Sequence, residues 1–425
     1  MIITQPNIIL IILDTLRADK TLLKSKTKDF TPTLRSLQEK SIYFEECISN
    51  YTWTTPSHIS MFTGLYSTQN LLLSGNINVL SKRLPNLTEI LKNLGYNTVY
   101  YSENPYINDR TGLSEGFNTR YDNWKTSLYI MHKSKKFMYF YIILGNLDLF
   151  VRKITKSQKI LKYWRKLRFF IERAYKTLII HLFWRYFVFK RKNSLNELDK
   201  FKKILKSANN PEPQYLFFNI MATHNPYIPI KEIFEYCEIK ISDIKDLKDF
   251  FLDPAKYNIY INLLSKRLHD KKIKKIQKFY DACVLYGDLI LKKILSNLEE
   301  LKLMDNSYII ITSDHGEHLC DLTDHYYWNH GVFQSVYEPL IRVPLIIYNK
   351  NLKKQIIEEQ VELKDLFHTI LHIASNSNRK NKYLKEENSI LHQIKNKSTP
   401  KYIFGEHVKN YQHIEKLLEL FGKNI

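Results

Sequence analysis

Two continuous apolar runs, each followed by an acidic residue, constrain the fold of this chain most strongly. The first run, Asn7–Leu13, leads into Asp14, and the second, Ser307–Thr312, leads into Ser313-Asp314-His315. An apolar run of this length without polar alternation predicts a strand buried on both faces, as in a parallel sheet covered by helices. Because such sheets bind their ligands at the carboxyl ends of the strands, the two acidic residues are expected to share one site.

The rest of the chain alternates between helix and strand patterns. Helical patterns occupy residues 31–40, 56–65, 87–94 and 279–301, and strand patterns occupy residues 42–46, 97–101 and 215–221. Pro32 in a first turn and Gly95 directly after a helical pattern are typical signals of helix start and stop. The alternation predicts an α/β fold with a largely parallel central sheet flanked by helices.

Two segments depart from this alternation. Residues 125–209 form a long helical, basic and aromatic insertion, and residues 349–425 are rich in Lys and Asn, with an amphipathic stretch at 361–374. We therefore predict a main domain built from residues 1–124 and 210–348, a helical insertion, and a small C-terminal subdomain.

Cysteine spacing and hydropathy indicate the compartment. The four cysteines show no C-x-x-C or C-x-x-H spacing, which favours reduced thiols over a disulfide framework or a zinc site. No segment has the pattern of a signal peptide, and polar residues interrupt the apolar stretches at 137–151 and 178–189. A bilayer span needs about 18 apolar residues in a row. The sequence thus predicts a cytoplasmic protein.

The net charge of +21 is concentrated in the insertion. Residues 125–192 contain 18 Lys or Arg against 2 Asp or Glu, which gives +16, interleaved with Phe, Tyr and Trp. Such a composition favours helices lying on an anionic membrane surface, which predicts a peripheral position at the inner membrane face. A helical lid packed on the core and a site for single-stranded nucleic acid are the alternatives, and we favour nucleic acid least.

Asp14, Asp314 and His315 are candidate metal ligands at neighbouring strand ends. Carboxylates, an imidazole and a hydroxyl together suit Zn²⁺, Mn²⁺, Mg²⁺ or Ca²⁺. The alternative is that each Asp caps a following helix, as Asp at the end of a strand often does. Their occurrence together at compatible strand ends favours coordination.

Thr54 is the candidate nucleophile. It lies just ahead of Pro56, which we place in a first helical turn, so its hydroxyl is expected near free backbone N–H groups and the positive end of the helix dipole. This position favours an anionic substrate and an alkoxide. The alternative is that Thr54 serves only as the N-cap.

Histidines supply candidate hydrogen-bond and proton donors. His58, His224 and His330 are expected to stabilise charge on an anionic substrate, and imidazole can also protonate a leaving group near neutral pH. The alternative for each is a packed or solvated histidine without a chemical role.

These motifs, in this order, resemble the sulfatase family of the alkaline phosphatase superfamily. The resemblance covers most of the chain outside the insertion, and it rests on residues 6–19, 56–65, 87–96, 280–288, 306–317 and 343–344. It implies an alkaline-phosphatase-like sandwich in which the main domain is catalytic. It also implies that Asp14, Asp314 and His315 bind a metal and that Thr54 occupies the position of the nucleophile, which also binds the metal.

Three positions depart from the family pattern. Sulfatases carry a Cys or Ser that is converted to formylglycine within C/S-x-P-S-R, whereas this chain reads Thr54-Thr-Pro-Ser-His58. Thr15 stands where many sulfatases have a second Asp. A threonine ester cannot collapse to an aldehyde, so it must be attacked at the transferred group, which is familiar for phosphorus.

The resemblance and the residues together predict a metal-dependent hydrolase or transferase. Its substrate is expected to be an anionic phosphate or sulfate ester, with lipid-linked and glycan esters as the candidates, and its cofactor one divalent ion. Zn²⁺ or Mn²⁺ is favoured, with Ca²⁺ or Mg²⁺ as alternatives. The alternative function is a catalytically inactive binding module of the same fold at an anionic membrane surface. The sequence leaves the oligomeric state open.

Overall fold

The computed structural model describes nine continuous stretches of the chain and some positions between them. The stretches are residues 5–21, 28–125, 193–207, 212–252, 267–320, 325–331, 336–375, 381–398 and 403–407, with shorter pieces inside 147–171 and 257–265. Among these residues, no helix is long and apolar enough to cross a membrane.

One mixed sheet of nine strands forms the centre of the molecule. Its strands are β1 (Asn7–Leu13), β2 (Ile42–Ile48), β3 (Asn97–Ser102), β4 (Thr119–Asp122), β5 (Gln214–Ile220), β6 (Ser307–Thr312), β9 (Arg342–Tyr348), β10 (Gln355–Ile357) and β11 (Val361–Glu362). They are ordered β10-β2-β9-β6-β1-β5-β3-β4, and β11 also pairs with β2. Of these strands, β9 runs antiparallel to both neighbours, and every other pairing is parallel. The prediction of a largely parallel sheet is confirmed.

The register of β1 against β6 brings the two acidic residues to the same level. Ile12 lies opposite Thr312, so Asp14 and Asp314 each follow two residues beyond a paired position. On the other side of β1, Leu13 lies opposite Ile220 of β5. Since these strands are parallel, both carboxylates emerge at the carboxyl edge of the sheet.

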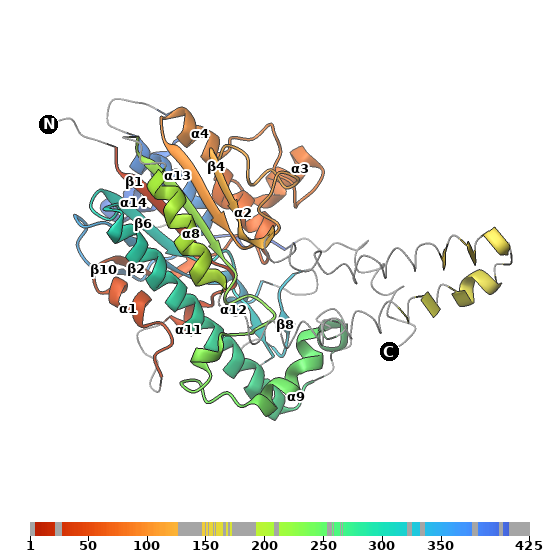
Figure 1. Cartoon of the computed structure of the whole chain (residues 1–425). Coiled ribbons are helices and arrows are strands. Elements are labelled where there is room, and N and C mark those ends of the chain that lie inside the picture. The colour runs from red at the N-terminus through yellow and green to blue at the C-terminus, as the bar shows by residue number, and fades with distance from the viewer. Residues whose placement is uncertain are drawn as a thin grey trace.

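Helices cover both faces of the sheet (Figure 1). On one face lie α1 (Pro32–Gln38), α8 (Asn193–Ser207), α9 (Ile241–Leu252) and α11 (Asp270–Glu300), and on the other lie α2 (Thr54–Thr63), α4 (Leu87–Asn93), α13 (Leu366–Ala374) and α14 (Ile390–Asn396). Alternate residues of β1 point into the two cores, with Ile9 and Ile11 in one and Ile8 and Leu10 in the other. The apolar run is buried on both faces, as predicted.

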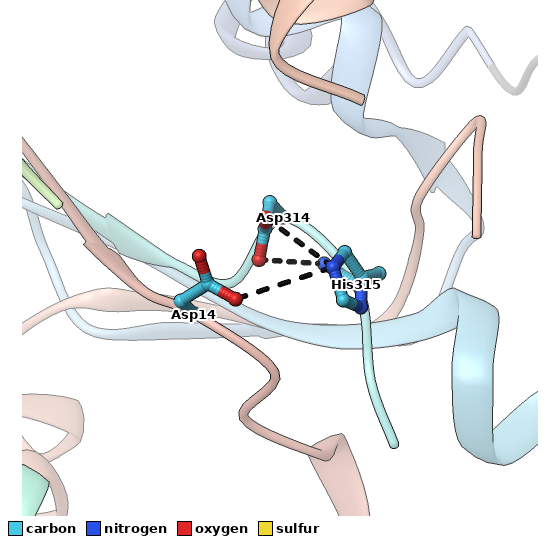
Figure 2. A group of neighbouring side chains, drawn as sticks. All are labelled: Asp14, Asp314 and His315. Atoms are coloured by element: carbon cyan, nitrogen blue, oxygen red, sulfur yellow. Dashed lines mark hydrogen bonds and ion pairs between the residues drawn. The ribbon is translucent and has the colours of Figure 1, made fainter. Parts of the chain in front are cut away.

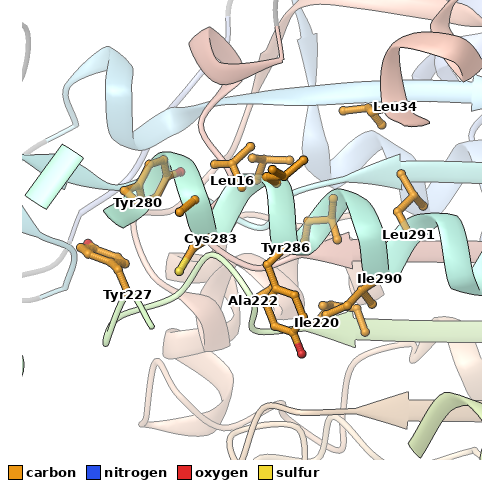
Figure 3. Packing of buried hydrophobic residues seen from close by; sticks show 14 of the residues in the cluster. Leu16, Leu34, Ile220, Ala222, Tyr227, Tyr280, Cys283, Tyr286, Ile290 and Leu291 are labelled. Carbon is orange, nitrogen blue, oxygen red and sulfur yellow. The ribbon is translucent and has the colours of Figure 1, made fainter. Parts of the chain in front are cut away.

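Helix α11 forms much of the first core and also supports other elements. Tyr280, Cys283 and Tyr286 lie along its buried side among residues of the cluster that Figure 3 shows. From the same helix, the Asp288 carboxylate accepts hydrogen bonds from the backbone N–H groups of Thr33 and Leu34, at 2.9 Å each. Asp288 therefore satisfies the N-terminus of α1, which its own Thr31 side chain does not cap.

Some predicted boundaries were wrong. The helix predicted at 279–301 begins at Asp270, and the helix predicted from residue 56 begins at Thr54. The amphipathic stretch 361–374 starts as strand β11 and a 3₁₀ turn before α13 begins at Leu366. The described chain also contains the short helices α3 (Ser67–Ser74) and α12 (Glu338–Ile341) and a hairpin of β7 (His318–Leu319) and β8 (Trp328–Asn329).

Parts of the segments predicted to be separate from the main domain contact its core. Strands β10 and β11 extend the central sheet at β2, and α13 packs against α2 and α4. Within 125–209, helix α8 places Leu198 and Phe201 in the first core. The division of the chain into a catalytic domain, an insertion and a C-terminal subdomain stays a prediction.

Candidate active site

Asp14, Asp314 and His315 meet at the carboxyl edge of the sheet, where β1 and β6 end (Figure 2). One ligand atom from each lies within 4.8 Å of the other two, and all three side chains are fully buried. His315 Nε2 lies 3.5 Å from Asp314 Oδ2 and 4.0 Å from Asp14 Oδ1. The structure thus brings together the three residues that the sequence singled out as metal ligands.

The backbone around this cluster is held in an uncommon conformation. Thr15 has φ of 65°, in the left-handed region that a β-branched residue rarely adopts. The Tyr280 hydroxyl donates to the Thr15 carbonyl at 2.7 Å, and the Thr15 N–H donates to Asp314 Oδ1 at 3.3 Å. Gly316 passes so close to Pro339 that an added Cβ would lie 2.0 Å from the Pro339 carbonyl oxygen. These contacts fix the loops that carry the carboxylates and His315.

The cluster has the properties of a cation site. Asp14 Oδ1 and Asp314 Oδ2 are buried and have no hydrogen-bond partner, and both lie near His315 Nε2. Buried charged oxygens without partners are costly unless a cation compensates them. Tetrahedral ligands at about 2.1 Å from a metal are separated by roughly 3.4 Å from one another, and the two distances from His315 Nε2 are 3.5 and 4.0 Å. Neither Asp begins a helix in the described structure, so the capping alternative is not observed.

The protonation of the two carboxylates also reflects this shared site. Burial, and then repulsion by Asp314, raises the pKa of Asp14 well above its ordinary value. Burial acts on Asp314 as well, but the His315 and His58 rings and the Thr15 N–H hold its pKa below the ordinary value. Two buried carboxylates this close cannot both ionise cheaply without a cation between them.

His315 presents a lone pair to this site. Its Nδ1–H donates to the Gly316 carbonyl at 2.9 Å, which leaves Nε2 unprotonated in the neutral ring. Burial lowers the pKa of His315, which favours that neutral form. This is the tautomer that a metal ligand requires.

Thr54 lies beside the same nitrogen. It is the first residue of α2, following Trp53, and its Oγ1 lies 3.4 Å from His315 Nε2. Trp53 holds the N-cap position of α2, so the alternative that Thr54 is the N-cap is not observed. The start of α2 is held against the cluster because Ser57 Oγ donates to the Asp314 carbonyl at 2.6 Å. The hydroxyl thus faces the cluster at the positive end of a helix.

The other predicted histidines lie at different depths. His58 is fully buried, with Nδ1 donating to the Thr54 carbonyl at 2.8 Å and Nε2 lying 3.3 Å from Asn219 Nδ2. Burial lowers its pKa, despite the attraction of Asp314. Both ring nitrogens of His58 therefore face protein groups around the proposed nucleophile, and its predicted role toward substrate stays a prediction.

His224 and His330 form a partly buried group next to His315. The His330 ring centroid is 4.9 Å from that of His224 and 4.5 Å from that of His315. Burial lowers the pKa of both His224 and His330 to about 4, so they are neutral hydrogen-bonding groups near pH 7 in the free protein. Their predicted action on substrate stays a prediction.

Two site residues were missed in the sequence. Asn104 is fully buried and its Nδ2 donates to Asp14 Oδ2 at 2.7 Å, and Glu317 Oε1 lies 3.0 Å from His330 Nδ1. Burial raises the pKa of Glu317 to about 7. Asn104 follows the strand pattern at 97–101, so its place at a strand end was the available signal; Glu317 lies two residues after His315.

Comparison with known proteins agrees with this fold. The model of the sulfatase family matches residues 6–377, and the chain belongs to that family. Arylsulfatase K of Canis lupus familiaris is 24% identical over 380 residues, which cover 87% of this chain and 63% of that protein. The arylsulfatase of Clostridium perfringens is 26% identical over 215 residues, covering 48% of this chain and 42% of that protein. This chain thus spans less than two thirds of the length of these relatives.

Solved structures share the architecture. The phosphonate monoester hydrolase of Agrobacterium radiobacter superposes with a TM-score of 0.62 at 15% identity, covering 98% of this chain and 83% of that one. The C-terminal periplasmic domain of EcEptC from Escherichia coli, in a complex with Zn, gives 0.58 at 14% identity, covering 96% and 91%. The predicted alkaline-phosphatase-like fold is confirmed.

Proposed function

We propose that this chain is a metal-dependent hydrolase or transferase that acts on a phosphate or sulfate ester with Thr54 as its nucleophile. One observation carries the proposal: the Thr54 hydroxyl, at the start of α2, lies 3.4 Å from His315 Nε2, beside two buried carboxylate oxygens that have no hydrogen-bond partner. A candidate nucleophile, a candidate cation site formed by Asp14, Asp314 and His315, and the positive end of a helix therefore lie together.

The residues divide into groups that bind, orient and donate. Asp14, Asp314, His315 and Thr54 would hold one divalent ion, which supplies polarisation of the ester and a lower pKa for the bound hydroxyl. Asn104 orients Asp14, since it donates to the carboxylate oxygen that faces away from His315. His330 is positioned by Glu317, 3.0 Å away. With His224 it would donate hydrogen bonds to the substrate.

A threonine nucleophile favours phosphorus over sulfur. In the proposed reaction Thr54 Oγ forms a bond to the central atom as the ester oxygen leaves with a proton, and a threonine ester remains. Water or an acceptor hydroxyl then attacks that same central atom and releases Thr54. This second displacement is ordinary for phosphate esters, and the names of the phosphonate hydrolase and phosphoethanolamine transferase neighbours agree with it. Whether water or a hydroxyl is the acceptor decides between hydrolysis and transfer.

The test is an assay of aryl phosphate, aryl phosphodiester and aryl sulfate with matched variants. Thr54→Ala should lower kcat by about 10³-fold or more, whereas Thr54→Ser should retain part of the activity. Thr55→Ala is the control, because it removes a neighbouring buried hydroxyl of the same helix. Metal-dependent turnover that survives Thr54→Ala would overturn the nucleophile assignment.

Metal analysis separates the enzyme from an inactive binding module of the same fold. We expect about one tightly bound divalent ion per chain, and we expect Asp314→Ala to lose it. The donor set of two carboxylates, one imidazole and one hydroxyl favours Zn²⁺ or Mn²⁺ over Ca²⁺ or Mg²⁺. A folded protein that takes up none of these ions would support the binding module instead.

A further inference from the structure

The basic insertion leaves and rejoins the body of the molecule at the edge that carries the candidate active site. Strand β4 is parallel to β3, and β3 is parallel to β5, which pairs with β1 in the same sense. The carboxyl end of β4, after which the insertion begins, therefore lies at the same sheet edge as Asp14.

Helix α8 brings the chain back from the same edge. The Tyr121 hydroxyl at the end of β4 donates to Glu197, near the start of α8. Further along, Leu198 and Lys202 contact Asn297 and Glu300 near the end of α11. Helix α8 therefore runs away from the site edge, and both ends of the stretch between residues 125 and 193 lie near that edge.

Two helical pieces within this stretch lie against each other: the first lies between residues 147 and 154, and the second between residues 159 and 171. We call the described positions of residues 147–171 the tip segment; Figure 1 draws them in yellow, well apart from the sheet. Asp148 on the first piece accepts a hydrogen bond from Trp164 Nε1 at 2.9 Å and pairs with Arg168 at 3.0 Å on the second piece. Asp148 is only 8% exposed, so this acidic side chain points into the contact between the two pieces.

Both pieces present an apolar stripe to solvent. The stripes are 42–66% exposed and consist of Leu147, Phe150 and Ile154 on the first piece and Ile160, Tyr163 and Leu167 on the second. Within each triplet the residues stand at i, i+3 and i+7, which places them on one face of a helix. The exposed side chains of Lys153, Lys159 and Lys162 lie among them in the sequence. The surface of a soluble monomeric protein rarely exposes so many large apolar side chains close together unless a partner covers them.

We infer that the tip segment docks on an anionic lipid bilayer, with its apolar stripes in the headgroup boundary and its lysines against the lipid phosphates. Charge complementarity selects this occupant, because the stretch carries +16 and a second copy of the same surface would repel it. The alternative of a lid requires these side chains to be buried on the core, and they are exposed. Nucleic acid would be stacked on aromatic rings, whereas most of the stripe residues are aliphatic.

The docking would place the candidate site at the membrane. Because the insertion starts and ends at the site edge, a bilayer bound to the tip segment lies toward the sheet edge that carries Thr54 and His315. Resting on the proposed function, this makes an ester at a membrane surface, such as a lipid headgroup, the expected substrate class.

Vesicle flotation of the full chain tests the docking without any assay of activity. The probes are vesicles of phosphatidylcholine alone and of phosphatidylcholine with about a third phosphatidylglycerol, at 0.1 M and 1 M salt. The protein should float with the anionic vesicles at low salt and lose most of this binding at 1 M, where the Debye length falls from about 10 Å to about 3 Å.

Two independent variants keep the test interpretable. Lys153→Gln with Lys159→Gln and Lys162→Gln should weaken partitioning by about 100-fold, and Phe150→Ser with Tyr163→Ser should also abolish flotation. The matched controls are Lys231→Gln with Lys271→Gln and Lys353→Gln, which are exposed elsewhere, and Leu72→Ser with Leu73→Ser on α3. The controls should float as the unmodified protein does, and all variants should keep its thermal midpoint.

The proposal is overturned if the unmodified protein ignores anionic vesicles at low salt, or if both tip variants still float. It is also overturned if light scattering shows a dimer that the tip variants disrupt while flotation is absent, because a second copy then occupies the stripes. Metal-dependent turnover that survives Thr54→Ala, with unchanged flotation, overturns the nucleophile assignment and leaves the docking intact, so the two proposals fail separately.

Discussion

Asn104 shows how a single neutral side chain can set the properties of a charged cluster. It is fully buried and donates to one oxygen of Asp14, which turns the other oxygen toward His315 Nε2. Removing this donor leaves the carboxylate free to rotate and buried without that hydrogen bond. Such outer partners typically change metal affinity by about 10–100-fold.

We predict that Asn104→Ala weakens binding of the divalent ion by about that factor, with a smaller loss of thermal stability. Competitive chelator titration measures the affinity. Asn93→Ala, at an exposed position at the end of α4, is the control and should bind as the unmodified protein does. An unchanged affinity in Asn104→Ala would show that Asp14 is held by other contacts or is no ligand.

Thr15 offers a second test at the scale of one residue. Its hydroxyl is buried without a partner, and its left-handed backbone suits Asp and Asn better than Thr. Thr15→Asp should add a third carboxylate to the cluster. We predict that it lowers the thermal midpoint in EDTA and enlarges the rise on adding metal.

Thr15→Asn is the matched control, since it has nearly the same shape and backbone preference but no charge. Differential scanning fluorimetry with EDTA, Zn²⁺, Mn²⁺ and Ca²⁺ provides the comparison. If Thr15→Asp and Thr15→Asn respond alike to metal, residue 15 does not face the cation.

Sequence reasoning found the candidate ligands and missed the residues that support them, for a physical reason. The apolar runs before Asp14 and Asp314 predict that each follows the end of a strand, and these runs are local patterns of seven and six residues. Tyr280 and Asn104 act through contacts with residues 265 and 90 positions away, and no local pattern encodes such contacts.

At the scale of elements, α11 supports the fold by capping a different helix. Asp288 is 2% exposed and accepts from two N–H groups of α1, and burial raises its pKa. We predict that Asp288→Ala lowers the free energy of unfolding by about 2 kcal/mol, in the upper range for a lost cap. Asp288→Asn should lose less, because one acceptor remains.

Urea denaturation measures both Asp288 variants, with Asp305→Ala in an exposed turn as the control. Because α1 is distant in sequence from α11, hydrogen exchange should show the N–H groups of Thr33 and Leu34 as the most affected. Equal stability of Asp288→Ala and the unmodified protein would mean that water replaces the cap.

The elements that the sequence predicted well are those defined by local apolar period and stop signals. Strand β1 was predicted at its observed bounds, and α4 ends close to Gly95 as expected. The reversed direction of β9 and the strand character of β11 depend on pairing with β6 and β2, far along the chain. Helix α11 begins nine residues before the predicted start. Its first turns carry many charged residues on the outside, and these obscured the apolar period in the sequence.

Across the whole molecule, the candidate site ties together parts of the chain that are distant in sequence. Asp14 and Asp314 are joined only through the folded sheet, and α2 reaches them through Ser57. The site formed by Asp14, Thr54, Asp314 and His315 exists only in the folded state, so an ion would be bound only there. Its binding free energy then adds to the stability of the entire domain.

Metal removal should accordingly destabilise the whole chain. We predict that EDTA lowers the thermal midpoint by several degrees, since binding at 100 times Kd contributes about 2.7 kcal/mol. The double variant Asp14→Asn with Asp314→Asn provides the sharpest comparison, because it removes both the cation ligands and the repulsion between buried carboxylates. Its midpoint should be insensitive to EDTA and at least as high as that of the metal-free unmodified protein. If the unmodified protein responds to none of Zn²⁺, Mn²⁺, Ca²⁺ and Mg²⁺ after chelation, the two carboxylates share a proton instead of a cation, and the proposed chemistry fails with the site.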